Sequence, residues 1–169
     1  MGAVTRVYLG IGSNLGDREA AHAHAGATLS AAGVRIAARS ALYLTEPVGG
    51  PPQDWFLNAV LRGDTALSPE EVLASCLAAE ETWGRVRGVR NGPRTLDVDV
   101  LFYGDVRREA PDPVLPHPRL HERRFVLVPL AEIAPDLVHP GFGLTVAELL
   151  ARCPDSSEVR PHPGLRAPA

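Results

Sequence analysis

Two aspartates, Asp97 and Asp99, stand two residues apart in the apolar segment 96–102. Because the side chains of a strand alternate between its faces, a strand here would bring both carboxylates onto one face, roughly 7 Å apart along the backbone (twice the ~3.3 Å rise). Like charges at this spacing repel each other unless a cation compensates them. Mg²⁺ usually takes one or two protein carboxylates together with substrate phosphates. The pattern therefore predicts a magnesium site, and the alternative is a solvated strand face that carries two ordinary acids.

Arginine is the only source of permanent positive side-chain charge in this chain, because all 17 Lys+Arg residues are arginines. The absence of lysine excludes a P-loop lysine, a Schiff-base lysine and a lysine general base. Arg85, Arg87 and Arg94 lie shortly before the two aspartates, and guanidinium groups bind phosphates through paired hydrogen bonds. Beside two metal-binding acids they provide the groups that phosphoryl transfer needs, so we expect a nucleotide ligand. Surface ion pairs between arginine and aspartate are the alternative.

Two further positions each have a structural and a ligand-binding interpretation. Glu80 falls on the apolar stripe of a predicted helix, where a buried carboxylate needs a partner. It forms either a helix-terminal salt bridge or a contact with the ligand. His117 stands between two prolines and ahead of several arginines. It is either a structural histidine or a hydrogen-bond donor to phosphate.

A glycine-rich segment and an aromatic–amide pair complete the candidates. Residues 10–16 join a predicted strand to a predicted helix, but they lack the spacing of a dinucleotide-binding fingerprint and the lysine of a P-loop. We interpret this segment as a structural turn. Phe56 and Asn58 share one strand face by period two, and such a pair can stack on a flat heterocycle and hydrogen-bond to it. Phe56 could equally belong to the core.

The elements that must position these residues form an α+β pattern. The expected elements are strands at 7–12, 34–48, 55–61 and 96–102, and helices at 17–33 and 68–84. Asp17 and Ser68 are the expected N-caps, and Gly33 and Gly84 the expected ends. The order βαββαβ is the ferredoxin-like pattern: an antiparallel sheet with both helices on one face, decorated by short additional C-terminal elements after residue 105.

Length and composition limit the remaining possibilities. A chain of 169 residues fits a single domain, which we place at 1–153, followed by a Pro-rich tail at 154–169 that we expect to be poorly ordered. The net charge of −3 argues against general nucleic-acid binding. Neither a membrane-spanning run nor a secretory signal is apparent, and the two cysteines do not form a scaffold. We therefore expect a cytoplasmic monomer without nucleic-acid or membrane partners.

Taken in order, these segments resemble the 6-hydroxymethyl-7,8-dihydropterin pyrophosphokinase family of folate biosynthesis. The resemblance runs from about Val7 to Leu150. Its motifs are Gly12-Ser13-Asn14-Leu15-Gly16-Asp17, Thr45…Pro47…Gly49, Phe56-Leu57-Asn58-Ala59, Gly84-Arg85-Val86-Arg87, Gly92-Pro93-Arg94-Thr95-Leu96-Asp97-Val98-Asp99, Pro116-His117 and Arg123-Arg124-Phe125-Val126-Leu127. The Gly-Pro-Arg-x-x-Asp-x-Asp segment is the most specific of them.

The resemblance implies an ATP-dependent diphosphotransferase that moves the β,γ-pyrophosphoryl group of ATP to the hydroxymethyl group of the reduced pterin and releases AMP. It implies two Mg²⁺ ions at Asp97 and Asp99, with Arg85 and Arg94 engaging the phosphates. The implied ATP-binding residues are Glu80, Arg87, Val100, His117 and Arg123, and the implied pterin-binding residues are Thr45, Val48, Phe56, Asn58 and Phe125.

The chain departs from the commonest family pattern at a few positions. Phe56 replaces a frequent tyrosine, Glu46 a frequent proline, and Asn91 and Pro118 stand where aromatic residues are frequent. The loop 84–92 is also one residue shorter than in some relatives. Stacking on the pterin should survive these changes, whereas individual contacts to ATP should differ.

Two other classes of function use similar features. A two-metal phosphohydrolase acting on a nucleotide would use the same aspartates and would need no pterin slot. A ferredoxin-like RNA-binding module would present aromatic and basic residues on its sheet, whereas this chain places two acids there. Pterin-dependent formation of AMP would separate the transferase from the hydrolase.

Overall fold

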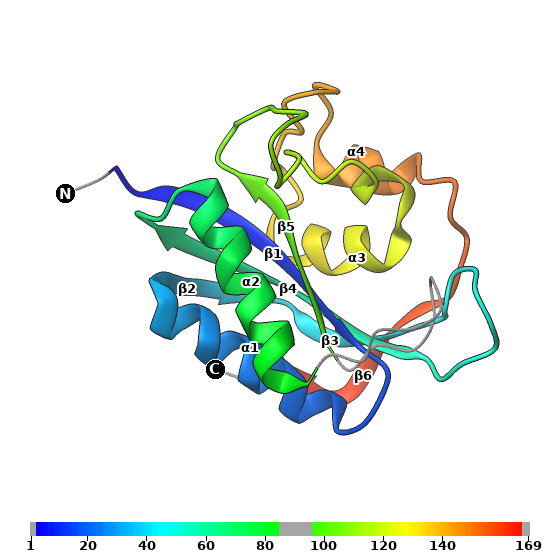
Figure 1. The fold of residues 1–169 in the computed structure, drawn as a ribbon. Coiled ribbons are helices and arrows are strands. Elements are labelled where there is room, and N and C mark those ends of the chain that lie inside the picture. The colour runs from blue at the N-terminus through cyan, green and yellow to red at the C-terminus, as the bar shows by residue number, and fades with distance from the viewer. Residues whose placement is uncertain (1–2, 85–95, 167–169) are drawn as a thin grey trace.

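The computed structural model describes residues 3–84 and 96–166, which form a six-stranded antiparallel sheet with helices on both faces (Figure 1). The strands are β1 (Thr5–Ser13), β2 (Val34–Arg39), β3 (Ala41–Thr45), β4 (Phe56–Thr65), β5 (Asp97–Tyr103) and β6 (Val159–Arg166). Their order across the sheet is β5-β1-β4-β3-β6, and β2 also pairs with β4. The order of the elements up to β5 confirms the ferredoxin-like prediction.

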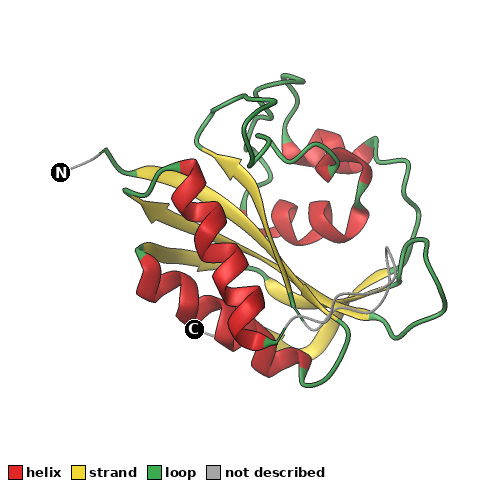
Figure 2. Ribbon diagram, in the orientation of Figure 1, coloured by secondary structure: helices red, strands yellow, loops and turns green. Residues whose placement is uncertain are grey.

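Two long helices, α1 (Arg18–Ala32) and α2 (Pro69–Trp83), cover one face of the sheet (Figure 2). Asp17 caps α1 by accepting a hydrogen bond from the backbone N–H of Ala20, and Ser68 forms a capping box with Glu71 at the start of α2. Both helices end at a glycine with positive φ, as predicted. The caps fix where each helix starts relative to the sheet.

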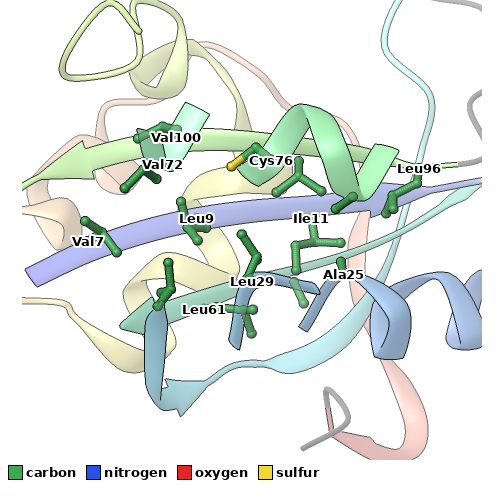
Figure 3. Packing of buried hydrophobic residues seen from close by; sticks show 14 of the residues in the cluster. Val7, Leu9, Ile11, Ala25, Leu29, Leu61, Val72, Cys76, Leu96 and Val100 are labelled. Carbon is green, nitrogen blue, oxygen red and sulfur yellow. The ribbon is translucent and has the colours of Figure 1, made fainter. Parts of the chain in front are cut away.

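Alternation along β1 distributes apolar side chains to both faces of the sheet. Val7, Leu9 and Ile11 point toward α1 and α2 and join the core cluster drawn in Figure 3. Tyr8 points to the opposite face, where it packs with Phe102 and the later helices. Each face of the central strands is therefore covered by its own apolar cluster.

The elements after residue 105 build the second layer. They are a short 3₁₀ helix, η1 (Leu120–Glu122), and the helices α3 (Arg124–Ile133) and α4 (Val146–Ala151). Leu127 and Leu130 of α3 are fully buried against the sheet. These additional C-terminal elements were predicted to be short decorations, and α3 and α4 in fact cover the face opposite to α1 and α2.

The strand predicted at 34–48 is interrupted at Ser40 and forms two strands, β2 and β3, which both pair with β4. The Ser40 hydroxyl oxygen accepts a hydrogen bond from the backbone N–H of Val60 at 2.9 Å. A side chain thus takes the place of one ladder partner at the break. The segments predicted as strands at 34–48 and 55–61 therefore pair with each other in antiparallel order on both sides of the break.

The prediction of a poorly ordered tail at 154–169 is wrong for residues 159–166, because these form β6 and pair with β3. A Pro-rich sequence argues against a central strand, since proline cannot donate to the ladder. β6 lies at the edge of the sheet, where Pro161 needs no second partner strand. His162 Nε2 also lies 3.1 Å from Glu19 Oε1 and so connects β6 to α1.

None of the helices within residues 3–84 and 96–166 is both long enough and apolar enough to cross a lipid bilayer.

Candidate active site

A pocket of about 650 Å³ lies on the face of the sheet that carries α3. Its floor comes from β1, β4 and β5, and its walls come from α3 and from the segments 45–53 and 117–123. The sequence-predicted residues that line it are Thr45, Val48, Phe56, Asn58, Asp97, Asp99, His117, Arg123 and Phe125. The structure thus brings the predicted pterin residues and the acid pair into one cavity.

The acid pair has the geometry that alternation predicts. Asp97 and Asp99 are half-buried on the pocket face of β5, while Val98 and Val100 between and after them are buried in the core on the other face. Among residues 3–84 and 96–166, no group of three His, Cys, Asp or Glu side chains has the arrangement of a complete metal site. A cation held by these two carboxylates would take its remaining ligands from water and from a substrate.

Two glycines of β1 form the floor between the acids and the amide. Gly12 pairs with Asp97 on one side and with Asn58 on the other, and Gly10 pairs in the same way with Asp99 and Val60. A Cβ atom added at Gly12 would lie 2.4 Å from Asn58 Oδ1. These glycines were not among the predicted site residues. Their period-two spacing inside a buried strand was the signal that could have identified them.

The amide of Asn58 is oriented by a neighbouring strand. Its Nδ2 donates a hydrogen bond to Thr45 Oγ1 at 2.6 Å, and both side chains are buried. Phe56 of β4 and Phe125 of α3 present aromatic surface to the same cavity, and half-exposed Val48 lies at its rim. The pocket therefore combines a fixed amide with two rings, which suits a flat, polar-edged heterocycle.

Side chains from the turn after β1 and from the start of α1 hydrogen-bond to the segment 53–55, which leads into β4. Asn14 Nδ2 donates to Gln53 Oε1 at 2.9 Å and to the backbone carbonyl of Asp54 at 2.8 Å. Arg18 Nη1 donates to the carbonyl of Trp55 at 2.9 Å. These contacts give the turn after Ser13 a structural role, as predicted, whereas Gly10 and Gly12 of the same predicted segment lie in β1 and line the pocket. The contacts also place Gln53, a pocket residue that the sequence did not indicate.

His117 stands in a positively charged wall beside Arg119 and Arg123. Burial, followed by the charges of Arg123 and Arg119, lowers the pKa of His117 to about 4. The ring is therefore neutral at pH 7. Its Nδ1 accepts a hydrogen bond from the backbone N–H of Arg119 at 3.2 Å, so the remaining ring proton lies on Nε2. Arg119 was not predicted as a site residue.

Arg123 contacts an aromatic ring and is influenced by the charge of the two acids. Its guanidinium carbon is 5.6 Å from the centroid of Phe125. Burial lowers the pKa of Arg123, while the negative charges of Asp99 and Asp97 act in the opposite direction. The arginine is held close to the acid pair and on the same side of the cavity.

A second, smaller pocket of about 330 Å³ lies beyond β5. Leu73 and Leu77 of α2 form one wall, the segment 112–114 forms another, and Asp99 and His117 belong to both pockets. The two cavities therefore meet at an acid and a neutral histidine.

Val100 lines the second pocket although its side chain is buried in the core. β5 is an edge strand, and the N–H of Val98 points away from β1 toward Glu80. Backbone groups of an antiparallel strand alternate with period two, so the N–H and C=O of Val100 face the same outer edge. Val100 can contact a ligand through its backbone.

Glu80 lines neither of these two pockets. It is 4% exposed, and its Oε2 accepts a hydrogen bond from the backbone N–H of Val98 at 2.8 Å. The buried Glu80 carboxylate thus has a backbone N–H of β5 among its partners. This contact connects α2 to the strand that carries Asp97 and Asp99. The other predicted phosphate-binding residues, Arg85, Arg87 and Arg94, lie outside the described residues.

Comparisons with known proteins agree with the resemblance. The chain is 52% identical over 158 residues to the 2-amino-4-hydroxy-6-hydroxymethyldihydropteridine pyrophosphokinase of Methylorubrum extorquens, which covers 93% of this chain and 99% of that protein. It is 43% identical over 152 residues to the protein of the same name from Pseudomonas aeruginosa, covering 89% and 93% of the two chains. These names support a transferase and do not support a phosphohydrolase.

A solved structure shows the same fold at low identity. A chain of Plasmodium falciparum HPPK-DHPS matches with a TM-score of 0.67 and 14% identity, over 89% of this chain and 43% of that longer chain. Finally, residues 8–135 match the model of one family, described as 7,8-dihydro-6-hydroxymethylpterin-pyrophosphokinase. This chain therefore belongs to the 7,8-dihydro-6-hydroxymethylpterin-pyrophosphokinase family.

Proposed function

We propose that this chain transfers the β,γ-pyrophosphoryl group of ATP to the hydroxymethyl group of 6-hydroxymethyl-7,8-dihydropterin in folate biosynthesis, giving AMP and the pterin diphosphate. The observation that carries the proposal is the junction of two pockets at Asp99 and His117. One pocket suits a flat heterocycle, and the other is smaller and lined mainly by apolar residues. A triphosphate that crosses the junction would bring both substrates to the acid pair.

The larger pocket is the proposed pterin site. Phe56 and Phe125 supply aromatic surface for stacking, and Asn58, held by Thr45, supplies an amide for the edge of the ring. Val48 lies at the rim and offers backbone groups. Buried polar groups that need hydrogen bonds disfavour ligands that cannot provide them, so this pocket should select a hydrogen-bonding heterocycle.

The smaller pocket is the proposed site of the adenine base. Leucine side chains of α2 provide apolar contact with the base, and the outward-facing backbone of Val100 provides a donor and an acceptor for its edge. His117 Nε2–H donates to a phosphate oxygen, and Arg123 adds positive charge nearby. Arg85, Arg87 and Arg94 complete the phosphate contacts in this proposal.

Asp97 and Asp99 fit a magnesium site, because hard oxygen ligands on one strand face open into a cavity large enough for water and phosphate. We assign two Mg²⁺ ions to this pair. When bound, Mg²⁺ neutralises negative charge on the triphosphate. The carboxylates of this chain hold and orient, and they do not attack the phosphate.

The chemical step joins the hydroxymethyl oxygen of the pterin to the β-phosphorus. As that bond forms, the hydroxyl proton is released to solvent, the bond from the β-phosphorus to the oxygen bridging to the α-phosphate breaks, and AMP leaves with that oxygen. The chain contributes mainly by holding the two substrates in line, with positive charge around the transferred group. We also propose that the enzyme acts as a monomer in the cytoplasm.

The test is an incubation of the protein with Mg²⁺ and ATP, with and without the hydroxymethyl pterin, followed by separation of the nucleotides. The proposal expects AMP only when the pterin is present. Pterin-independent release of phosphate or pyrophosphate would instead support a hydrolase. The predicted mass from sedimentation is that of one chain, 18.0 kDa.

A further inference from the structure

Arg108 organises the loop that forms one wall of the smaller pocket. Its backbone N–H donates to the carbonyl of Leu115, and the N–H of Leu115 donates back to the carbonyl of Arg108, both at 2.9 Å. This pair of hydrogen bonds closes the loop 109–114. The Arg108 guanidinium points into the loop: Nε donates to the carbonyl of Pro113 and Nη2 to the carbonyl of Asp112, both at 3.1 Å.

The same guanidinium reaches across to the opposite wall. Its Nη1 lies 2.9 Å from Glu70 Oε2, and Glu70 stands in the first turn of α2. Leu73 and Leu77 follow Glu70 on this helix at intervals of three and four residues, so they lie one above the other on one side of it. They line the pocket opposite the segment 112–114. One side chain therefore bridges both walls of the cavity.

The charge pair itself does not explain this arrangement. The side chain of Glu70 is 52% exposed, and such ion pairs contribute little to stability. The Arg108 side chain, in contrast, is only 19% exposed, and it satisfies two consecutive backbone carbonyls. The planar fork of arginine can bind two carbonyls and a carboxylate at once, whereas the single ammonium group of a lysine cannot reproduce that geometry.

We propose that Arg108 is a positioning residue for the nucleoside half of ATP, which keeps the wall 112–114 at a fixed distance from Leu73 and Leu77 so that the base is held between them. The inference rests on the proposed function in one respect, namely that the base of ATP occupies the smaller pocket. Arg108 lines neither pocket and does not touch the phosphate junction among the described residues. Its effect should therefore be confined to ligands that carry a base.

The experiment compares two ligands that share the phosphates and differ in the nucleoside. Calorimetry gives the Kd of a non-hydrolysable Mg–ATP analogue and of inorganic tripolyphosphate for the wild-type protein, Arg108→Ala and Arg107→Ala. Arg107 is adjacent and exposed, and its removal changes the net charge equally. We expect Arg108→Ala to bind the ATP analogue about tenfold more weakly, about 1.4 kcal/mol. Its affinity for tripolyphosphate and for the pterin, and all affinities of Arg107→Ala, should match those of the wild type.

Two outcomes would overturn the proposal. If Arg108→Ala weakens the binding of the ATP analogue and of tripolyphosphate equally, Arg108 acts through its charge. If the affinity for both ligands is unchanged, other contacts hold the wall 112–114. If Arg108→Ala does not fold, Glu70→Gln provides the test, because it retains both carbonyl contacts and loses the charged connection to α2. Glu70→Gln should weaken the binding of the ATP analogue by a few fold and leave the binding of tripolyphosphate unchanged. Equal effects on the two ligands would again refute the proposal.

Steady-state kinetics separates positioning from a general loss of structure. Arg108→Ala should raise KM for ATP and leave kcat and KM for the pterin near their wild-type values, whereas a damaged fold would lower kcat as well. The binding measurements need no turnover. If the wild-type protein binds the ATP analogue with the predicted dependence on Arg108 but forms no AMP with the pterin, the proposed reaction fails while the inference about Arg108 stands.

Discussion

Replacing Gly12 by alanine should abolish tight binding of the pterin without unfolding the protein. Gly12 pairs with Asn58 across β1 and β4, and an added Cβ would lie 2.4 Å from Asn58 Oδ1. Ordinary van der Waals contacts of a Cβ start at 3.4 Å. The Asn58 side chain must therefore move by about 1 Å (3.4 − 2.4), or β1 must shift away from β4.

A displacement of this size breaks the hydrogen bond that orients the amide. Because β4 lies between β1 and β3, moving Asn58 Oδ1 away from Gly12 pushes the amide toward Thr45, whose Oγ1 already lies only 2.6 Å from Asn58 Nδ2. The amide cannot move by about 1 Å in that direction and must rotate out of the hydrogen bond. Leaving a buried polar group without its partner costs about 1–3 kcal/mol, and the amide is no longer placed for the ligand. We expect the affinity for the pterin to fall by about 10- to 100-fold.

The assay is calorimetric titration with the pterin, and Gly10→Ala is the matched control. Gly10 lies two residues earlier on the same face of β1, and a Cβ there would meet only Leu101 at 3.5 Å, an ordinary contact. Gly10→Ala leaves Asn58 and its hydrogen bond to Thr45 in place, so it should lose less affinity than Gly12→Ala although Gly10 also lines the pocket, and both variants should unfold at temperatures close to that of the wild type. Wild-type affinity in a folded Gly12→Ala protein would refute the reasoning, and so would equal losses in the two variants.

Three further predictions follow from the described contacts. Asp97→Asn and Asp99→Asn should each lower kcat/KM at least about 100-fold with little change in thermal unfolding, because these half-buried acids lie off the core and are assigned to the metal; near-normal activity in both would contradict that assignment. Burial lowers the pKa of His22 to about 4 from its ordinary 6.5, so between these pH values the unfolded chain binds more protons and the wild type should lose about 3 kcal/mol of stability as the pH falls. Urea unfolding of His22→Gln should show a correspondingly flatter pH dependence, and identical slopes would exclude this histidine as the cause. Arg160→Ala removes a cation–π contact, 4.7 Å from the centroid of the Trp55 ring, that connects β6 to the segment before β4, so it should lower the free energy of unfolding by about 0.5–1 kcal/mol and leave the Kd for the pterin unchanged; an unchanged free energy of unfolding would contradict this role of the contact.

Local signals in the sequence were sufficient for most of the fold. Asp17, Ser68 and the terminal glycines fixed both long helices, because caps act within a few residues of the chain. β6 was missed for the opposite reason. Its partner, β3, lies more than a hundred residues earlier, and its proline content reads as disorder unless the strand is known to lie at an edge.

The candidate site was predictable where chemistry depends on residue type, and less so where it depends on shape. The acid pair and the Phe56–Asn58 face follow from period-two alternation, and the structure brings both into one pocket. Gly12 matters through a side chain that it lacks, and its importance is visible only once Asn58 is placed opposite. Arg108 acts through carbonyl groups of a loop, which carry no sequence signal.

The sequence left two interpretations open for Glu80 and for His117, and the choice between them became clear only from where the structure buries each side chain. Glu80 is enclosed at the joint between α2 and β5, where its carboxylate accepts a backbone N–H, so its influence on the nucleotide would pass through the position of the edge strand. His117 is enclosed at the junction of the two pockets, and its lowered pKa keeps the ring neutral. This neutral ring can donate a hydrogen bond to a phosphate oxygen through Nε2–H. The positive side-chain charge that accompanies the triphosphate across the junction, beside the proposed Mg²⁺ ions, must then come from arginine, because the chain contains no lysine.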